Sequence, residues 1–243
     1  MTDYRSVEIF RGLRVVDMTT GMAGPLASMV LADHGADVVK VEPVGGEWAR
    51  ALLAFSFWNR GKRSLEIDLD DEAHRSRLAA VVAGADVLLA TDAAGVLRRI
   101  GMAESPGERS RLVTCSISGF GPAADDSGDR PYEAIVAART GRMSELDALS
   151  GAPPGLPTSG PIFTAAPVAS FGASQLAVHG IIASLLQRQR TGVGQHVATS
   201  LLEGAVAFVM RQELGRGGDS VAGISEVTHR GIELCFLTAE CAD

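Results

Sequence analysis

Short apolar runs alternate with longer helical stretches through the first half of the sequence, and this alternation limits the possible folds more than any other feature. The run LRVVDM (13–18) precedes a stretch with helical spacing, GPLASMVLADHG (24–35), and a second run, ADVVKVEP (36–43), stops at a proline. Two strands joined through a helix run parallel, because the crossover returns the chain to the same edge of the sheet. The sequence therefore predicts an α/β fold, with a parallel sheet covered by helices on both faces.

The same pattern recurs along the chain. Further strands are predicted at 63–69, 86–91 and 111–118, and further helices at 71–85, 132–141, 171–190 and 201–214. Two loops rich in Gly, Asp and Pro, 119–131 and 150–161, separate the later elements, and neither is typical of a domain linker. At 243 residues the chain is long for one ordinary domain and short for two, so we expect one large domain.

Composition argues against several classes of protein. The net charge of -7, without a run of Lys or Arg, argues against a surface for nucleic acid or for an anionic membrane. Polar residues interrupt every apolar run before it reaches the length of a membrane span, and the N-terminal segment has no apolar leader, so we expect a cytoplasmic protein. Three cysteines without a CxxC pair or a histidine at ligand spacing predict neither disulfides nor a metal site.

Two short stretches have the chemistry to bind phosphate groups. TTGMAGP (19–25) opens a predicted helix, where backbone N–H groups can receive an anion, although turn glycines explain such a pattern about as often. WNRGKRS (58–64) places Arg60, Lys62 and Arg63 beside Trp58, a set suited to holding phosphates and stacking an aromatic base. A solvated loop is an equal alternative for the second stretch.

No catalytic triad can be read from the sequence. The five histidines form no HxxxH and pair with no serine or cysteine motif, and the position of His179 within an apolar helix favours a packing role. Tyr132 and Glu133 begin a helix directly after a Gly/Pro loop, where functional polar groups are often held. An equal alternative for Glu133 is a stabilising role, because a negative charge is favoured in the first turn of a helix. The stretch APVASFGAS (166–174) holds no acid, no base and no thiol.

Five ordered motifs within residues 12–205 make the sequence resemble the class III (family III) CoA-transferases, the group that includes formyl-CoA transferase, carnitine CoA-transferase and α-methylacyl-CoA racemase. The motifs are LRVVDMTTGMAGPLASMVLADHGADVVKVEP, NRGKRSLEIDLDD, SISGFGP, PYEAIVAARTGRM and GIIASLLQRQRTGVGQHVATSLLEGA. The resemblance implies a Rossmann-like large domain, an acyl-CoA ligand and a dimer of interlocked chains. It assigns residues 1–215 to the large domain and 216–243 to the segment leading to a small domain, which is missing.

The resemblance places the family's nucleophilic aspartate at Ser170. In the family that carboxylate forms an acyl anhydride and then an aspartyl-CoA thioester, whereas a serine has no carboxylate, and a hydroxyl with no base at hand is a poor nucleophile. Tyr132 and Glu133 resemble the residues that flank the thioester in the transferase branch. The two-base proton transfer of the racemase branch is not supported, because its histidine and acid fall on these same three positions.

The resemblance also implies a coenzyme A site. Met22 stands at the position of the transferase's active-site glutamine. The family's CoA-binding loop corresponds to ATDAAG (90–95), which keeps only Gly95 of the family pattern. Arg99 falls on a position that contacts phosphate in the family. The full set of expected coenzyme A contacts is Met22, Ala23, Arg60, Lys62, Arg63, Gly95 and Arg99.

The expected function is therefore CoA transfer between an acyl-CoA and a small carboxylic acid. Because Ser170 replaces the aspartate, the transferring carboxylate is expected to come from another copy of the fold or to be absent. The expected assembly is a homodimer or a heterodimer with another family III chain. The alternative is a catalytically degenerate structural partner subunit that needs no CoA. The apolar stripe of the helix 201–214 suits a partner chain, although packing on this chain's own sheet explains it equally.

Overall fold

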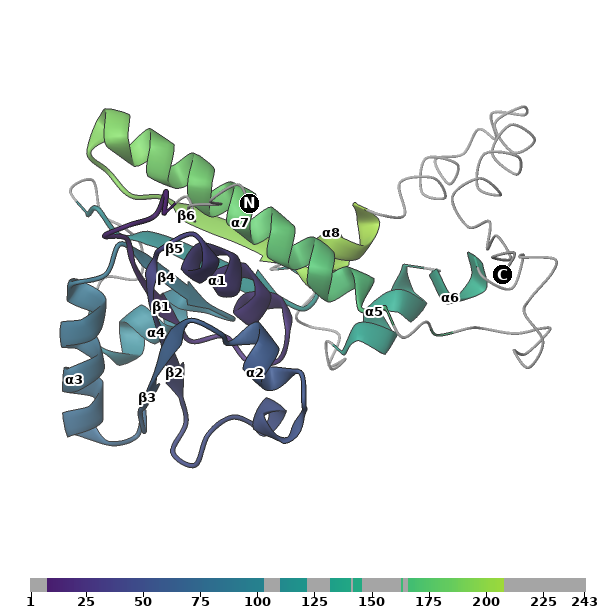
Figure 1. The fold of residues 1–243 in the computed structure, drawn as a ribbon, viewed down its shortest axis with the longest axis horizontal. Helices are drawn as coiled ribbons and strands as arrows, with labels where there is room; N and C mark the ends of the chain where they lie inside the picture. The colour runs from purple at the N-terminus through teal and green to yellow at the C-terminus, as the bar shows by residue number, and fades with distance from the viewer. Residues whose placement is uncertain are drawn as a thin grey trace, which may run out of the picture. The chain divides into compact units, whose positions relative to one another are not determined.

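A computed structural model of the chain describes residues 8–102, 110–121, 132–140, 142–145, 163 and 166–207. Six strands form one sheet in the order β3-β2-β1-β4-β5-β6, and every neighbouring pair is parallel (Figure 1). This is the strand order of a Rossmann-type sheet, so the predicted parallel α/β fold is confirmed. The strands are β1 (Arg14–Asp17), β2 (Asp37–Glu42), β3 (Lys62–Glu66), β4 (Val87–Ala90), β5 (Val113–Ser118) and β6 (His196–Ser200).

Helices connect the strands and cover the two faces of the sheet. They are α1 (Ala23–Asp33), α2 (Phe55–Trp58), α3 (Glu72–Ala83), α4 (Ala93–Arg99), α5 (Glu133–Arg139), α6 (Arg142–Glu145), α7 (Val168–Thr191) and α8 (Leu201–Val206), with a short 3-10 helix η1 (Trp48–Ala51). The expected domain boundary at residue 215 lies outside the described residues.

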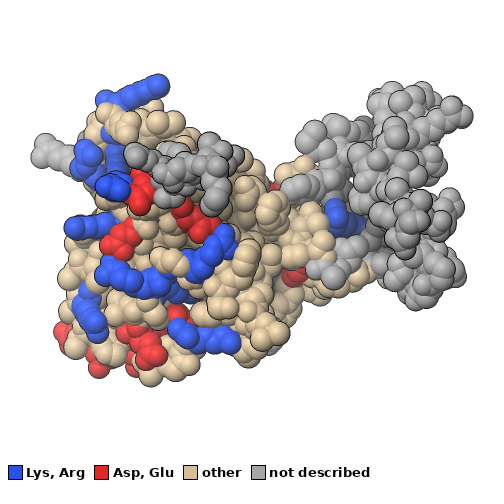
Figure 2. All heavy atoms as spheres, in the orientation of Figure 1, with Lys and Arg blue, Asp and Glu red and all other residues tan. Residues whose placement is uncertain are grey.

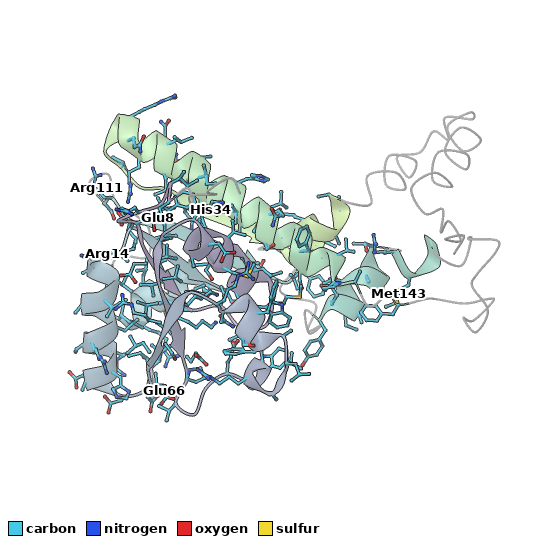
Figure 3. All side chains as sticks on the ribbon, viewed as in Figure 1. Glu8, Arg14, His34, Glu66, Arg111 and Met143 are labelled. Atoms are coloured by element: carbon cyan, nitrogen blue, oxygen red, sulfur yellow. The ribbon has the colours of Figure 1, made fainter. Side chains whose placement is uncertain are left out.

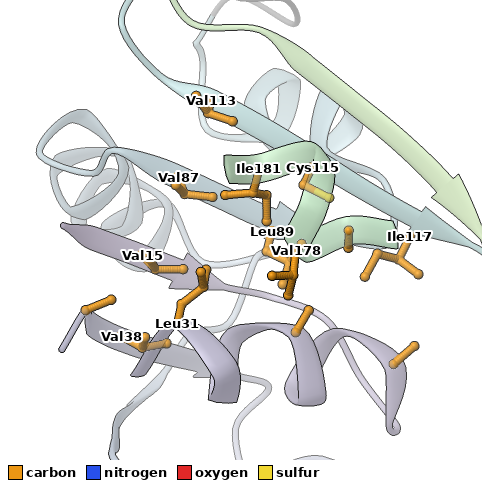
Figure 4. Close-up of a cluster of buried hydrophobic side chains, with 14 of the residues drawn as sticks. Val15, Leu31, Val38, Val87, Leu89, Val113, Cys115, Ile117, Val178 and Ile181 are labelled. Atoms are coloured by element: carbon orange, nitrogen blue, oxygen red, sulfur yellow. The ribbon is translucent and has the colours of Figure 1, made fainter. Parts of the chain in front are cut away.

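Alternate residues of the strands face two separate cores. On one face, Val15 packs with Leu31 of α1 and Ile181 of α7, so these two helices cover the strands on that side (Figure 4). On the other face, Val16 packs with Leu78 of α3, and α4 joins the same cluster. A fully buried Leu or Ile side chain contributes about 1.5–3 kcal/mol, so the two cores hold the sheet between its helices.

The long helix α7 is the central support of the first core. It starts at Val168, three residues before the predicted start, and this places Ser170 in its first turn. Within the described part of the chain, α7 alone is long and apolar enough to cross a membrane, and half of that stretch is buried inside the fold. Its buried residues include Ala173, Ala177 and Ile181, as expected of a core helix.

Candidate active site

A cavity of about 650 Å³ lies at the edge of the sheet where the strands end. Its walls come from the segments that follow four strands: 19–24 after β1, Thr91 after β4, 117–119 at the end of β5 and Leu201 after β6. β1 and β4 are neighbours, but the chain leaves them toward opposite sides of the sheet, and ligands of such folds bind at this switch point. Figure 3 shows Arg14 and Arg111 at the other edge, where β1 and β5 begin.

The structure brings five of the predicted site residues to this cavity. Met22 and Ala23 come from the loop after β1, Tyr132 and Glu133 from the start of α5, and Ser170 from the first turn of α7. α5 lies against the N-terminal end of α7 (Figure 1). The residues therefore share one site, while the role of each stays a prediction.

A hydrogen-bond cluster joins Glu133 to the start of α7. The Glu133 carboxylate accepts hydrogen bonds from the backbone N–H groups of Ala169 (2.6 Å) and Ser170 (2.9 Å). The Ser170 hydroxyl donates to the same carboxylate, with 2.7 Å between the Ser170 Oγ and the Glu133 Oε2. Glu133 thus caps a helix that begins more than thirty residues away, where a negative charge is favoured.

This cluster corrects the sequence-based view that Ser170 has no base at hand, because the Glu133 carboxylate lies within hydrogen-bond distance of its hydroxyl. The other requirements of a serine nucleophile are not met in this turn. The next backbone donors are also occupied, since the Val168 N–H bonds to the Ala166 carbonyl and the Phe171 N–H bonds to the Pro167 carbonyl. The first four N–H groups of α7 are therefore not available to stabilise an oxyanion on an acyl group bound to Ser170.

A buried ion network holds the loop that forms the cavity floor. The Asp17 carboxylate accepts hydrogen bonds from the Thr19 N–H (3.0 Å) and the Ser28 hydroxyl (2.5 Å). The Lys62 ammonium lies 3.2 Å from the same carboxylate, and the Lys40 ammonium donates to the Thr19 carbonyl. Both lysines are almost fully buried, so the loop after β1 is fixed from beneath by charges that do not reach solvent.

Burial and charge pull the pKa values of this network in opposite directions. Burial raises the pKa of the Asp17 carboxyl, but Lys40, Lys62 and two hydroxyl donors outweigh it, so that pKa lies below 3.8. Burial lowers the pKa of Lys62 below 10.5 despite the attraction of Asp17. Burial also raises the pKa of Glu47, which lies 3.7 Å from the Lys40 ammonium. Burial and the neighbouring charges thus both shift the pKa values of this network.

The remaining predicted site residues do not line this cavity. Arg60, Arg63 and Arg99 are exposed on the surface, and each forms an ion pair with an aspartate, at 2.5 Å, 2.6 Å and 2.6 Å respectively. Lys62 is buried against Asp17, and the Gly95 N–H in the first turn of α4 donates to the Asp92 side chain that caps the helix. Their contacts with coenzyme A stay predictions, and the four cations already have protein partners.

A second cavity of about 420 Å³ lies at the ends of β1, β2 and β3. Thr20 lines both cavities, so the loop after β1 separates them. Glu42 and Asp68 are among the wall residues of the second cavity. Glu42 is bound to the Arg50 guanidinium at 2.6 Å, so its charge is neutralised within the protein.

Sequence reasoning missed several residues of the main cavity. Trp48, Thr91, Ser118 and Leu201 all line it, and three of the four follow or end a strand of the sheet. Strand ends were the signal that could have found them, because ligands of parallel sheets bind at the carboxyl ends of the strands. Trp48 had no such signal, since it lies on η1, a helix that sequence spacing does not predict.

Other candidate groups lie elsewhere. His179 is exposed on α7, so the expected packing role is wrong. Cys115 is a buried free thiol in the first core, and burial raises its pKa to about 12. Across the described ranges, no group of three or more His, Cys, Asp or Glu side chains has the arrangement of a metal site.

Comparison with known proteins identifies relatives of the whole described fold. A family model described as CoA-transferase family III matches residues 10–233. The chain is 34% identical over 211 residues to the acetyl-CoA:oxalate CoA-transferase of Acetobacter aceti, a match that covers 82% of this chain and 52% of that protein. It is also 34% identical over 219 residues to the succinyl-CoA:mesaconate CoA-transferase of Haloarcula hispanica, covering 82% and 53%. The chain thus spans about half the length of these curated relatives.

Solved structures support the same relationship. Rv3272 from M. tuberculosis superposes with a TM-score of 0.73 at 28% identity, covering 88% of this chain and 60% of that one. A CaiB/BaiF family protein from Brucella suis superposes with a TM-score of 0.73 at 28% identity, covering 87% and 58%.

Proposed function

Since this chain belongs to CoA-transferase family III, we propose that it binds an acyl-CoA in the cavity at the carboxyl edge of its sheet and takes part in CoA transfer to a carboxylic acid. One observation carries the proposal: Met22, Ala23, Tyr132, Glu133 and Ser170, from three separate segments, line one cavity at the switch point of the sheet. The relatives named above are an acetyl-CoA:oxalate and a succinyl-CoA:mesaconate CoA-transferase, which supports the reaction class.

The carboxylate that carries the acyl group is proposed to come from another copy of the fold. An acyl anhydride needs a carboxylate, and Ser170 offers a hydroxyl that is bonded to Glu133. The Glu133 carboxylate itself holds two backbone N–H groups of α7, and this use as a helix cap supports a positioning role. Tyr132, more than half exposed at the cavity, is proposed to contact the thioester. A heterodimer with another family III chain that keeps the aspartate would complete the site, whereas a homodimer would hold Ser170 in both copies.

A second function is that of a structural partner subunit that needs no CoA. It is favoured by the ion pairs that the residues expected to contact phosphate already form within the protein. Arg60, Arg63 and Arg99 are paired with aspartates, and Lys62 is paired with Asp17 inside the protein. Binding a diphosphate through them would require exchanging these partners. Exposed ion pairs are worth at most about 1 kcal/mol, so such an exchange is feasible for the three arginines. A cytoplasmic location is proposed in either case.

Calorimetric titration with CoA separates the two functions. An acyl-CoA-binding chain is expected to bind CoA with a Kd below about 1 mM, and a weaker affinity favours the structural subunit. Thr91→Trp fills the cavity from an exposed wall position and is expected to weaken binding at least about tenfold. Thr191→Trp, the same change at the exposed far end of α7, is the matched control and should leave binding unchanged. Native mass spectrometry of the complex from the host would show whether a second family chain is bound.

A further inference from the structure

We infer that the acyl group accepted by this cavity is uncharged and largely apolar, and is not the acyl group of a dicarboxylic acid. The inference rests on the proposed function, because it takes the cavity of about 650 Å³ as the acyl-CoA site. It adds the chemical class of the substrate to that function.

The charges of the cavity wall carry the first half of the argument. Among the described residues that line it there is no Lys, Arg or His. The one charged residue among the described wall residues, Glu133, is an acid, and its carboxylate is bound to the first turn of α7. A second carboxylate on a bound acyl group would thus have a negative neighbour and, among these described residues, no cation to pair with, which is costly for a group removed from water.

Backbone dipoles offset this charge only in part. The first four N–H groups of α7 are already bonded to protein acceptors. The starts of α1 (Ala23), α5 (Glu133) and α8 (Leu201) also line the cavity, and a helix N-terminus presents about half a unit of positive charge. The acid Glu133 stands in the first turn of α5, and these dipoles act on any acyl-CoA, whatever its acyl group.

The apolar side chains of the wall carry the second half. Five large apolar or aromatic side chains line the cavity: Met22, Trp48, Ile117, Tyr132 and Leu201. Trp48 is 64% exposed and Tyr132 is 58% exposed, so two large aromatic surfaces face the ligand space without protein covering them. Apolar side chains gathered around a few polar groups are typical of sites for apolar ligands.

On the face drawn in Figure 2, the described surface between α2 and α5 is mostly uncharged, whereas Lys, Arg, Asp and Glu side chains are spread over the rest of the α/β body. The inference sets this chain apart from the relatives named for oxalate and mesaconate, which are both dicarboxylates.

Calorimetric titration of the full chain with CoA, hexanoyl-CoA and succinyl-CoA tests the inference. We expect hexanoyl-CoA to bind at least about tenfold more tightly than CoA, and succinyl-CoA to bind no more tightly than CoA. Succinyl-CoA binding as tightly as hexanoyl-CoA, or hexanoyl-CoA binding no better than CoA, would overturn the inference while leaving the proposed function in place. Failure of all three to bind would instead overturn the proposed function, and the inference with it.

A cation placed in the cavity should reverse the preference. Met22→Arg is expected to make succinyl-CoA bind more tightly than hexanoyl-CoA, and Thr91→Arg does the same from an exposed position that leaves the core intact. Met143→Arg, on α6 and outside the cavity (Figure 3), is the matched control and should keep the wild-type order. An unchanged order in folded Met22→Arg and Thr91→Arg would show that wall charge does not select the acyl group.

Discussion

Replacing Glu133 by alanine should destabilise the protein through the start of α7, far from Glu133 in the sequence. The substitution removes the acceptor of the Ala169 N–H, the Ser170 N–H and the Ser170 hydroxyl, at 2.6, 2.9 and 2.7 Å. A lost helix cap costs about 1 kcal/mol, and each hydrogen bond to a charged group contributes about 1.5–3 kcal/mol. Water can replace part of this because Glu133 is only half-buried, so we expect a loss of about 2 kcal/mol and a Tm lower by about 4–8 °C.

Urea unfolding followed by circular dichroism measures this loss, and two variants separate its parts. Ser170→Ala removes only the hydroxyl bond and should cost about 1 kcal/mol, less than the usual value for a bond to a charged group because water also reaches the half-buried Glu133. Glu203→Ala removes an exposed glutamate from the first turn of α8 and should change stability by less than about 0.5 kcal/mol. If Glu133→Ala unfolds at the same urea concentration as Glu203→Ala, the carboxylate does not hold the start of α7, and the positioning role assigned to Glu133 is wrong.

Two further predictions concern buried groups. Asp17→Asn leaves Lys62 buried without a carboxylate and Lys40 with Glu47 alone, and should reduce the free energy of unfolding by about 3–5 kcal/mol near neutral pH. Because the pKa of Asp17 in the folded protein lies below 3.8, the stability that its carboxylate contributes is present above pH 3.8 and is lost as the pH falls through the folded pKa. If the difference in free energy of unfolding between wild type and Asp17→Asn stays constant in acid, the ion network does not contribute this stability. Burial raises the pKa of Cys115 to about 12, so this thiol should resist iodoacetamide in the folded protein and react after unfolding in urea. Peptide mass spectrometry measures the labelling, and rapid labelling of Cys115 in the folded protein would show that β5 is not buried.

The sheet could be predicted from the sequence largely because short runs rich in Val, Leu and Ile mark its inner strands. β1, β2, β4 and β5 fall within the predicted runs, since strands buried on both faces read as continuous apolar stretches. β6 (His196–Ser200) gives no such signal, because it is an edge strand in which polar residues alternate. The strand order was also out of reach, since the sequence does not state which strands pair.

The candidate site could also be predicted only in part. The grouping of Tyr132, Glu133 and Ser170 followed from the family resemblance, and the structure places them around one cavity. Lys62 read as a surface cation because it stands beside two arginines, but at the first position of β3 its side chain turns inward to Asp17. Only the parallel pairing of the strands brings these two residues, 45 positions apart, into contact.

CoA transfer by the purified chain alone tests the central claim most directly, namely that this chain binds acyl-CoA but does not itself carry the transferring carboxylate. Exchange of a labelled carboxylic acid into its CoA thioester should stay at the background rate with the wild type. It should also fall short of full activity with Ser170→Asp, because Met22 and the loop 90–95 also depart from the family pattern. Robust exchange by the wild-type chain, with an acyl adduct mapped to Ser170, would contradict the account.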